Sequence, residues 1–268
     1  MYDEAADFAE QRTQVQRMDD ALAEVGVAID WPSAVVCDVG GGGGLHAGLL
    51  ASRVLRAHCA DVIDQHARYN GEFVKLQAEK FQRHGAVLPI DRYEFNVTDA
   101  TRMMFRDDWF DFMCSVNAFE HIPDPTQALA EIARVLRPGA PVYISFDPIW
   151  TADTGSHFER YVPEPWAHLL LDESQFILRM REAGAADWEV EDFRWSMNHV
   201  RLPVYERLFR VRAGEMGLDL LLFRSWSGTV HASHLEHPNF ARALETYSRE
   251  ELLTRGMTAV LRKRPTRR

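Results

Sequence analysis

The chain has 268 residues, of which 46% are hydrophobic and 26% are charged, and its formal net charge is −10. This length can bury one large core, or one core with an insertion. The negative charge repels a phosphate backbone, so nucleic acid is not expected as a partner. No apolar stretch approaches the roughly 20 residues of a membrane span, and the acidic N-terminal residues do not resemble a signal peptide. We therefore expect a cytoplasmic protein with no membrane partner.

Alternating strands and helices dominate the first two thirds of the chain. The apolar positions of residues 2–26 recur at helical spacing and predict an amphipathic helix. Strands are predicted at residues 34–39, 57–63, 92–97, 110–116, 141–146, 187–193 and 257–262. Helices are predicted at residues 45–55, 68–84, 126–136 and 172–183. Such alternation implies right-handed crossovers and a mainly parallel sheet with helices on both faces.

The regular alternation ends after residue 146. Residues 147–171 are rich in Pro, Trp and His and are expected to form a structured loop. Residues 194–245 fit no strand–helix unit, and we expect them to form a mostly helical cap. The predicted division of the chain is a helical lid segment at 1–32, the core at 33–193, the cap insertion at 194–245, and the last strand with a basic, solvated tail at 246–268.

Three cysteines, Cys37, Cys59 and Cys114, occur without a CxxC pair. An odd and sparse set argues against a disulfide framework. Cys37 and Cys114 lie within apolar runs and are expected to be small buried side chains.

A glycine-rich turn follows the first predicted strand. Its pattern is Asp38-x-Gly40-x-Gly42-x-Gly44, within five consecutive glycines. Glycine has no Cβ, so the backbone can turn sharply and let a ligand approach closely. A strand, glycine turn and helix form the usual nucleotide-type site of an open α/β sheet. The glycine run alone also satisfies a loose dinucleotide pattern, so the identity of the ligand stays open at this point.

Asp64 lies at the end of the second predicted strand. Its carboxylate can accept two hydrogen bonds from the hydroxyls of a ribose, which favours an adenosine-containing ligand. The alternative is that Asp64 only caps the next helix.

Residues 99–139 distinguish between the possible ligands. They contain Asp99-Ala100, Phe105 with Phe110-Asp111, Glu120-His121, and a helix that ends in Arg134-Val135-Leu136-Arg137-Pro138-Gly139. In these motifs, and in the glycine turn, the chain resembles the class I S-adenosylmethionine-dependent methyltransferases. The resemblance covers roughly residues 33–146 and implies a Rossmann-like sheet of seven strands.

The resemblance also implies which residues bind S-adenosylmethionine. Asp38 with Gly40, Gly42 and Gly44 would hold the methionine part, Asp64 the ribose, Asp99 and the Ala100 amide the adenine, and Asn117 the methionyl end. Asn96 could share the role of Asp99. No metal is expected; His231, His234 and His237 recur every three residues, but only Glu236 could complete a ligand set.

Methyl transfer mainly requires that cofactor and acceptor are held in line in a dry pocket. A base is needed only where the acceptor atom carries a proton with a high pKa. The candidate bases are His121, His157, His168 and Asp147. For each histidine the alternative is a structural role, and His121 belongs to the Glu-His pair of the resemblance.

We therefore expect a methyltransferase of small-molecule biosynthesis, with O-methylation favoured and an acceptor of the sugar or secondary-metabolite type. Two alternatives are a catalytically inactive cofactor-binding or regulatory protein of the same fold and a nicotinamide-dependent oxidoreductase. The sequence leaves open the acceptor, the atom methylated and the choice between monomer and homo-oligomer.

Overall fold

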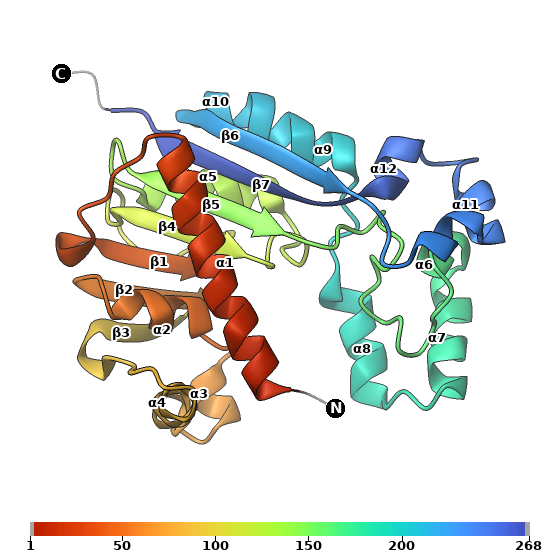
Figure 1. Cartoon of the computed structure of the whole chain (residues 1–268), viewed down its shortest axis with the longest axis horizontal. Helices are drawn as coiled ribbons and strands as arrows, with labels where there is room; N and C mark the ends of the chain where they lie inside the picture. Colours follow the sequence, from red (N-terminus) through yellow and green to blue (C-terminus); the bar gives the residue numbers. More distant parts are fainter. Residues whose placement is uncertain (1–2, 266–268) are drawn as a thin grey trace.

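A computed structural model describes residues 3–265, which are built around one seven-stranded sheet with the order β3-β2-β1-β4-β5-β7-β6 (Figure 1). The strands are β1 (Val35–Val39), β2 (Arg56–Asp61), β3 (Tyr93–Val97), β4 (Phe112–Val116), β5 (Pro141–Phe146), β6 (Leu218–Ser227) and β7 (Thr254–Lys263). Strands β1 to β5 pair in parallel, whereas β7 runs antiparallel to both of its neighbours. The predicted α/β class, with its mainly parallel sheet, is confirmed.

Helices cover both faces of the sheet. Packed on one face are α1 (Glu4–Glu24), α2 (Leu45–Ala51) and α4 (Phe73–Arg83), and on the other α5 (Pro125–Val135), α9 (Leu202–Arg207), η3 (Leu208–Arg212) and α10 (Ala213–Glu215). The remaining helices are α3 (Gln65–Arg68), α6 (Ala167–Leu170), α7 (Glu173–Glu182), α8 (Asp187–Ser196), α11 (Pro238–Ala243) and α12 (Arg249–Leu253), with the short turns η1 (Trp31–Ser33), η2 (Ile90–Arg92) and η4 (Ala232–Glu236).

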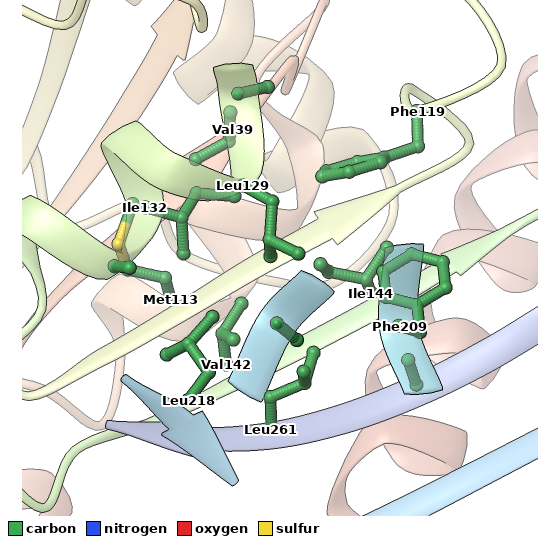
Figure 2. Packing of buried hydrophobic residues seen from close by; sticks show 14 of the residues in the cluster. Val39, Met113, Phe119, Leu129, Ile132, Val142, Ile144, Phe209, Leu218 and Leu261 are labelled. Atoms are coloured by element: carbon green, nitrogen blue, oxygen red, sulfur yellow. The ribbon is translucent and has the colours of Figure 1, made fainter. Parts of the chain in front are cut away.

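The two hydrophobic cores follow from the alternation of side chains along each strand. On the α5 side, Leu129 and Ile132 pack against Val142 and Ile144 of β5, as Figure 2 shows. On the α1 side, the buried stripe of α1 includes Met18 and lies against a different set of strand residues. Both faces of the central strands are therefore buried, as expected of a parallel sheet.

The predicted strand at 187–193 is wrong, because these residues form helix α8. Val190 and Phe193, three residues apart, are the buried positions, which is helical spacing. Glu189 supports the helix start by accepting a hydrogen bond from the Ala186 amide at 2.8 Å. The sixth strand in the sequence is instead β6.

Strand β6 and the helices before it lie inside the segment 194–245 that was predicted to be a cap. Tyr205 and Phe209 are fully buried in the core on the α5 side, so α9 and η3 cover the sheet as part of the main body. A smaller helical layer lies beyond the carboxyl ends of the strands, made of α6, α7, α8, α11 and α12 (Figure 1). The cap is therefore assembled from residues on both sides of β6, and not from one insertion.

The basic run near the C-terminus is partly structural. Lys263 Nζ donates to Asp108 at 2.7 Å and to the Leu136 carbonyl at 2.8 Å, where it satisfies an acceptor at the end of α5. Arg264 binds Asp219 at 2.7 Å. The prediction of a solvated tail is therefore wrong for Lys263, whose side chain is mostly covered, whereas Arg264 remains exposed. Residues 266–268 lie outside the described part of the chain.

Asn198 joins the helical layer to the loop after β4. Its side-chain nitrogen donates to the carbonyls of Phe119 and Ile122 at 2.7 and 2.9 Å. The Asn198 side-chain oxygen accepts from the Tyr205 hydroxyl at 3.1 Å. The backbone N–H of Asn198 donates to the Glu120 carbonyl at 2.9 Å. One side chain thus satisfies several buried backbone groups at once.

We expect Asn198→Ala to lower the free energy of unfolding by about 2–4 kcal/mol, because it removes the side-chain donor of the Ile122 carbonyl and leaves the Phe119 carbonyl with only the Tyr205 hydroxyl as a side-chain donor. Urea denaturation measures the change. Asn239→Ala is the control, since its side chain makes a single bond to the Pro165 carbonyl and its loss should cost about 1 kcal/mol or less. Equal losses in the two variants would contradict the central role of Asn198.

Candidate functional site

The glycine loop lies at the carboxyl end of β1, the central strand. Gly40 and Gly44 have φ values of 70° and 72°, which favour glycine. A Cβ on Gly40 would collide with Ala118, and one on Gly44 would collide with the Tyr93 hydroxyl. The loop is thus held tightly against neighbouring elements, and its own backbone is left as the surface that a ligand can approach.

Asp61 fixes the outer side of this loop and was missed by the sequence analysis. Its carboxylate accepts the Gly42 amide at 2.7 Å and the Ile63 amide at 2.8 Å. Strand β2 ends at Asp61, two residues earlier than predicted, so Asp61 is the acid at the strand end. Asp64 lies further on, exposed, where it caps α3 by accepting the Ala67 amide at 2.9 Å.

Asp38 lies beneath the loop and is only 1% exposed. Its Oδ2 has no hydrogen-bond partner among residues 3–265, and the Nδ1 of the buried His46 lies 3.8 Å from it. Burial raises the pKa of the Asp38 carboxyl to about 7. The other oxygen, Oδ1, accepts from Cys114 Sγ at 3.6 Å. A buried carboxyl with one oxygen left unpartnered under a glycine loop fits a ligand that carries positive charge, as the amino group and sulfonium of S-adenosylmethionine do.

The predicted adenine site follows β3. Asp99 is exposed and uses one carboxylate oxygen to accept from the Thr101 amide and hydroxyl, at 2.7 and 2.8 Å. The neighbouring Ala100 is half-buried. The Asn96 side-chain oxygen is 2.9 Å from His58 Nδ1 within the sheet, so it already has a partner there.

Two cavities adjoin at Asn117, which follows β4 with a φ of 50°. One has a volume of about 310 Å³ and is lined by residues 40–43 of the glycine loop. The other has a volume of about 560 Å³ and lies between α1 and the sheet face formed by β5, β7 and β6. Asn117 lines both cavities, so a ligand at the glycine loop would lie next to a second molecule under α1.

Of the predicted catalytic residues, Asp147 lines the larger cavity. Burial raises the pKa of its carboxyl, which shifts it towards a base that works near neutral pH. His121 and His157 pack edge to face behind it, with ring centroids 5.2 Å apart. The ring nitrogen Nε2 of His157 is 3.3 Å from the Pro148 carbonyl, and burial lowers the pKa of His157 to about 4. His121 contacts the Ser196 carbonyl through Nδ1.

Glu120 is the other unpartnered buried acid. It is 1% exposed, and within the described part of the chain neither carboxylate oxygen has a hydrogen-bond partner. Burial raises its pKa well above the ordinary range, and the nearby Asp147 carboxylate adds to the effect. Burial of the acid of the Glu-His pair therefore favours its protonated form.

Three further histidines, His168, His234 and His237, make hydrogen bonds within the helical layer. His168 Nε2 is 2.7 Å from the Trp150 carbonyl, and His234 Nδ1 is 2.6 Å from the buried Asp153. His237 caps α11 by accepting the Asn239 amide. Residues 3–265 contain no group of three His, Cys, Asp or Glu side chains placed to hold a metal ion. All three cysteines are free and buried.

A parallel sheet with a glycine loop at its central strand and an acid at the end of the adjacent strand defines an α/β protein that binds a nucleotide-type cofactor. Residues 37–144 match the sequence model of a family described as a methyltransferase domain. The chain thus carries a class I methyltransferase domain of the type that binds S-adenosylmethionine, which confirms the resemblance inferred from its motifs.

Individual relatives agree with this family. The chain is 34% identical over 146 residues to a probable chloroplastic tocopherol O-methyltransferase of Oryza sativa subsp. japonica, a match that covers 53% of this chain and 37% of that protein. The match therefore spans less than half of the relative's length.

Solved structures share the fold. One is a protein of Galdieria sulphuraria provisionally assigned as a sarcosine dimethylglycine methyltransferase, with a TM-score of 0.56, 20% identity, and coverage of 93% of this chain and 84% of that one. Another is the [4+2]-cyclase SpnF, with a TM-score of 0.52, 18% identity, and coverage of 93% and 80%. No helix among the described residues is long and apolar enough to cross a membrane.

The raised pKa of Asp38 predicts a specific pH dependence of stability. The folded protein holds a proton on Asp38 between the ordinary value of 3.8 and about 7, whereas the unfolded chain loses it, so stability falls as pH rises through this window. We expect Asp38→Asn to remove a decline on the order of 3 kcal/mol between pH 4.5 and 7.5, measured by urea denaturation.

Three buried histidines act in the opposite direction. Burial lowers the pKa of His46, His157 and His168 to about 4, so their contribution to stability is lost as pH falls below 6.5. Only the difference between wild type and Asp38→Asn therefore tests Asp38. An identical pH profile in both proteins would show that Asp38 is ionised throughout.

Asp61 and Asp64 can be separated by binding of S-adenosylhomocysteine. We expect Asp61→Asn to weaken binding at least tenfold, because it loosens the glycine loop and removes the acid at the strand end. Asp64→Asn keeps the contact between Gly42 and Asp61 and should weaken binding less. Calorimetry compares the affinities of the two variants for S-adenosylhomocysteine. A larger loss of affinity in Asp64→Asn than in Asp61→Asn would give Asp64 the larger role.

Proposed function

We propose that the chain is an S-adenosylmethionine-dependent methyltransferase that acts on a small-molecule acceptor held in the cavity under α1. The observation that carries this proposal is the position of Asn117 in the walls of both cavities. It makes the glycine-loop site and the larger cavity neighbours, which is the arrangement that direct transfer between two bound molecules requires.

The proposed cofactor residues are those named by the resemblance, with Asp61 added. Asp38 and the glycines Gly40, Gly42 and Gly44 would hold the methionine part, Asp64 the ribose, Asp99 and Ala100 the adenine, and Asn117 the methionyl end. When bound, S-adenosylmethionine supplies a methyl group on a positively charged sulfur, which the acceptor attacks in line. The contribution of the chain is to position both molecules and to exclude water.

Asp147 is the proposed general base, because it lines the cavity and burial raises its pKa. His121 and His157 are proposed to hold the loop that carries Asp147, since His157 contacts the Pro148 carbonyl next to it. A base of this kind suits a hydroxyl acceptor, which loses a proton during transfer. Together with the O-methyltransferase named among the relatives, this favours O-methylation.

A sugar or secondary-metabolite acceptor and a cytoplasmic location remain part of the proposal. The mixture of polar and apolar residues in the cavity wall supports the former, and the three cysteines without a disulfide support the latter. The competing function is a cofactor-binding protein without catalysis, for which the unpartnered Glu120 and Asp38 would be structural. Nicotinamide chemistry is the third possibility, and binding of NAD tests it directly.

The function is tested by incubating the full chain with S-adenosylmethionine and a panel of small phenols, sugars, hydroxy acids and amines. The expected result is release of S-adenosylhomocysteine with a hydroxylated compound. Calorimetry should show binding of S-adenosylhomocysteine and none of NAD. NAD binding alone would overturn the proposal, and cofactor binding without turnover on any compound would favour the non-catalytic alternative.

We expect Asp147→Asn to lower kcat by about 10²- to 10⁴-fold with unchanged affinity for S-adenosylhomocysteine, because the base is lost and the cofactor site is intact. In wild type the rate should rise with pH as the Asp147 carboxyl loses its proton, and the variant should lack this rise. Asp91→Asn, which alters an exposed acid outside the cavity wall, is the control and should keep the full rate. A full rate in Asp147→Asn would exclude Asp147 as the base.

A further inference from the structure

The strand order distinguishes the two ends of the larger cavity. It begins at Asn117, where it meets the cofactor site, and continues across β5, β7 and β6. The atom that receives the methyl group must therefore lie at the Asn117 end, beside Asp147. The rest of the acceptor extends across the sheet towards β6, which is two strand spacings, or about 10 Å, from β5.

The floor of the cavity is set by strand register. Ser145 of β5 lies opposite Thr258 of β7, which in turn lies opposite Arg224 of β6. The Ser145 and Thr258 hydroxyls are hydrogen-bonded to each other at 3.0 Å. Leu222, Arg224 and Trp226 alternate along β6 and all line the cavity.

The Trp226 side chain of β6 lies close to Asp147 on this floor. Gly256 of β7 has no side chain, and a Cβ there would lie 2.4 Å from Asp147 Cβ, 2.5 Å from the Phe146 carbonyl oxygen and 2.5 Å from the Trp226 ring. Trp226 and Asp147 therefore come together over Gly256. Trp226 lines the cavity and is 36% exposed, so its indole is accessible for a planar group to stack on.

Arg224 supplies positive charge at the end of the cavity away from Asn117. Within the described residues its guanidinium makes one hydrogen bond, to Glu24 at the end of α1, although it has five N–H donors. By contrast, Arg53 uses two nitrogens on Asp19, both at 2.7 Å. Both partners of the Arg224–Glu24 pair are about half exposed, so the pair contributes little stability and another anion can replace Glu24.

We propose that the acceptor is a planar hydroxylated molecule with an anionic group at the far end, which stacks on Trp226, places its hydroxyl beside Asp147 and binds Arg224 in place of Glu24. This inference rests on the proposed function and defines its substrate class. The Glu24 carboxylate shows the chemistry that this position binds, and a planar carboxylate matches the fork of a guanidinium.

The test uses three probes of similar shape in the presence of saturating S-adenosylhomocysteine: 3-(4-hydroxyphenyl)propionate, its neutral methyl ester, and the cationic tyramine. We expect the propionate to bind at least tenfold more tightly than the ester, and tyramine to bind most weakly. Arg224→Gln should reduce the affinity for the propionate to that for the ester. Glu24→Gln should raise the affinity for the propionate several-fold and leave the ester unchanged, because it removes the competing carboxylate.

Arg12→Gln is the matched control. It removes an exposed charge from α1, the helix that carries Glu24, at a position outside the cavity wall, and should change none of these affinities. Equal binding of the three probes, tighter binding of tyramine, no binding of any probe, or an unchanged propionate affinity in Arg224→Gln would each overturn the inference. Failure of S-adenosylhomocysteine itself to bind would instead overturn the proposed function.

Discussion

The rest of the structure depends on how closely the glycine loop approaches the elements around it. Residues of β2, β3 and the segment after β4 fill the space that a side chain at Gly40, Gly41 or Gly44 would need. Because all of these contacts converge on one turn, the central strand, its two neighbours and the cofactor site form a single packed unit. The hydrogen bond from the Gly42 amide to Asp61 then fixes the direction of the loop backbone.

Much of the sheet could be predicted because its strands have local signals. Strand β5 agrees with its predicted range of 141–146, since an apolar run bounded by Pro and Asp is readable from a few residues. The prediction of a strand at residues 187–193 was wrong because the positions of Val and Phe in this short acidic segment fit both the helical and the strand period. The regular alternation of strands and helices before it then favoured a strand. Strand β6 was missed because its partner, β7, lies distant in the sequence, and the pairing that stabilises it has no local signal.

The candidate site shows the same division. The glycine turn, Asp147 and Asn117 could be named from the sequence because each directly follows a strand. Asp61 was missed because the end of β2 was predicted two residues too late, and periodicity defines the end of a strand less well than its middle. The far wall of the cavity, with Arg224 and Trp226, depends on register across three strands and could not be inferred from spacing along the chain.

The position of β7 between β5 and β6 has a consequence for synthesis of the chain. The ribosome produces β7 after every other described strand, yet β6 has no neighbour in the sheet until β7 is inserted. The half of the sheet that carries the glycine loop can pair earlier, because β1 to β5 are already complete. A nascent chain would therefore assemble the half of the sheet with the glycine loop first, and the β6 wall of the larger cavity only when β7 emerges.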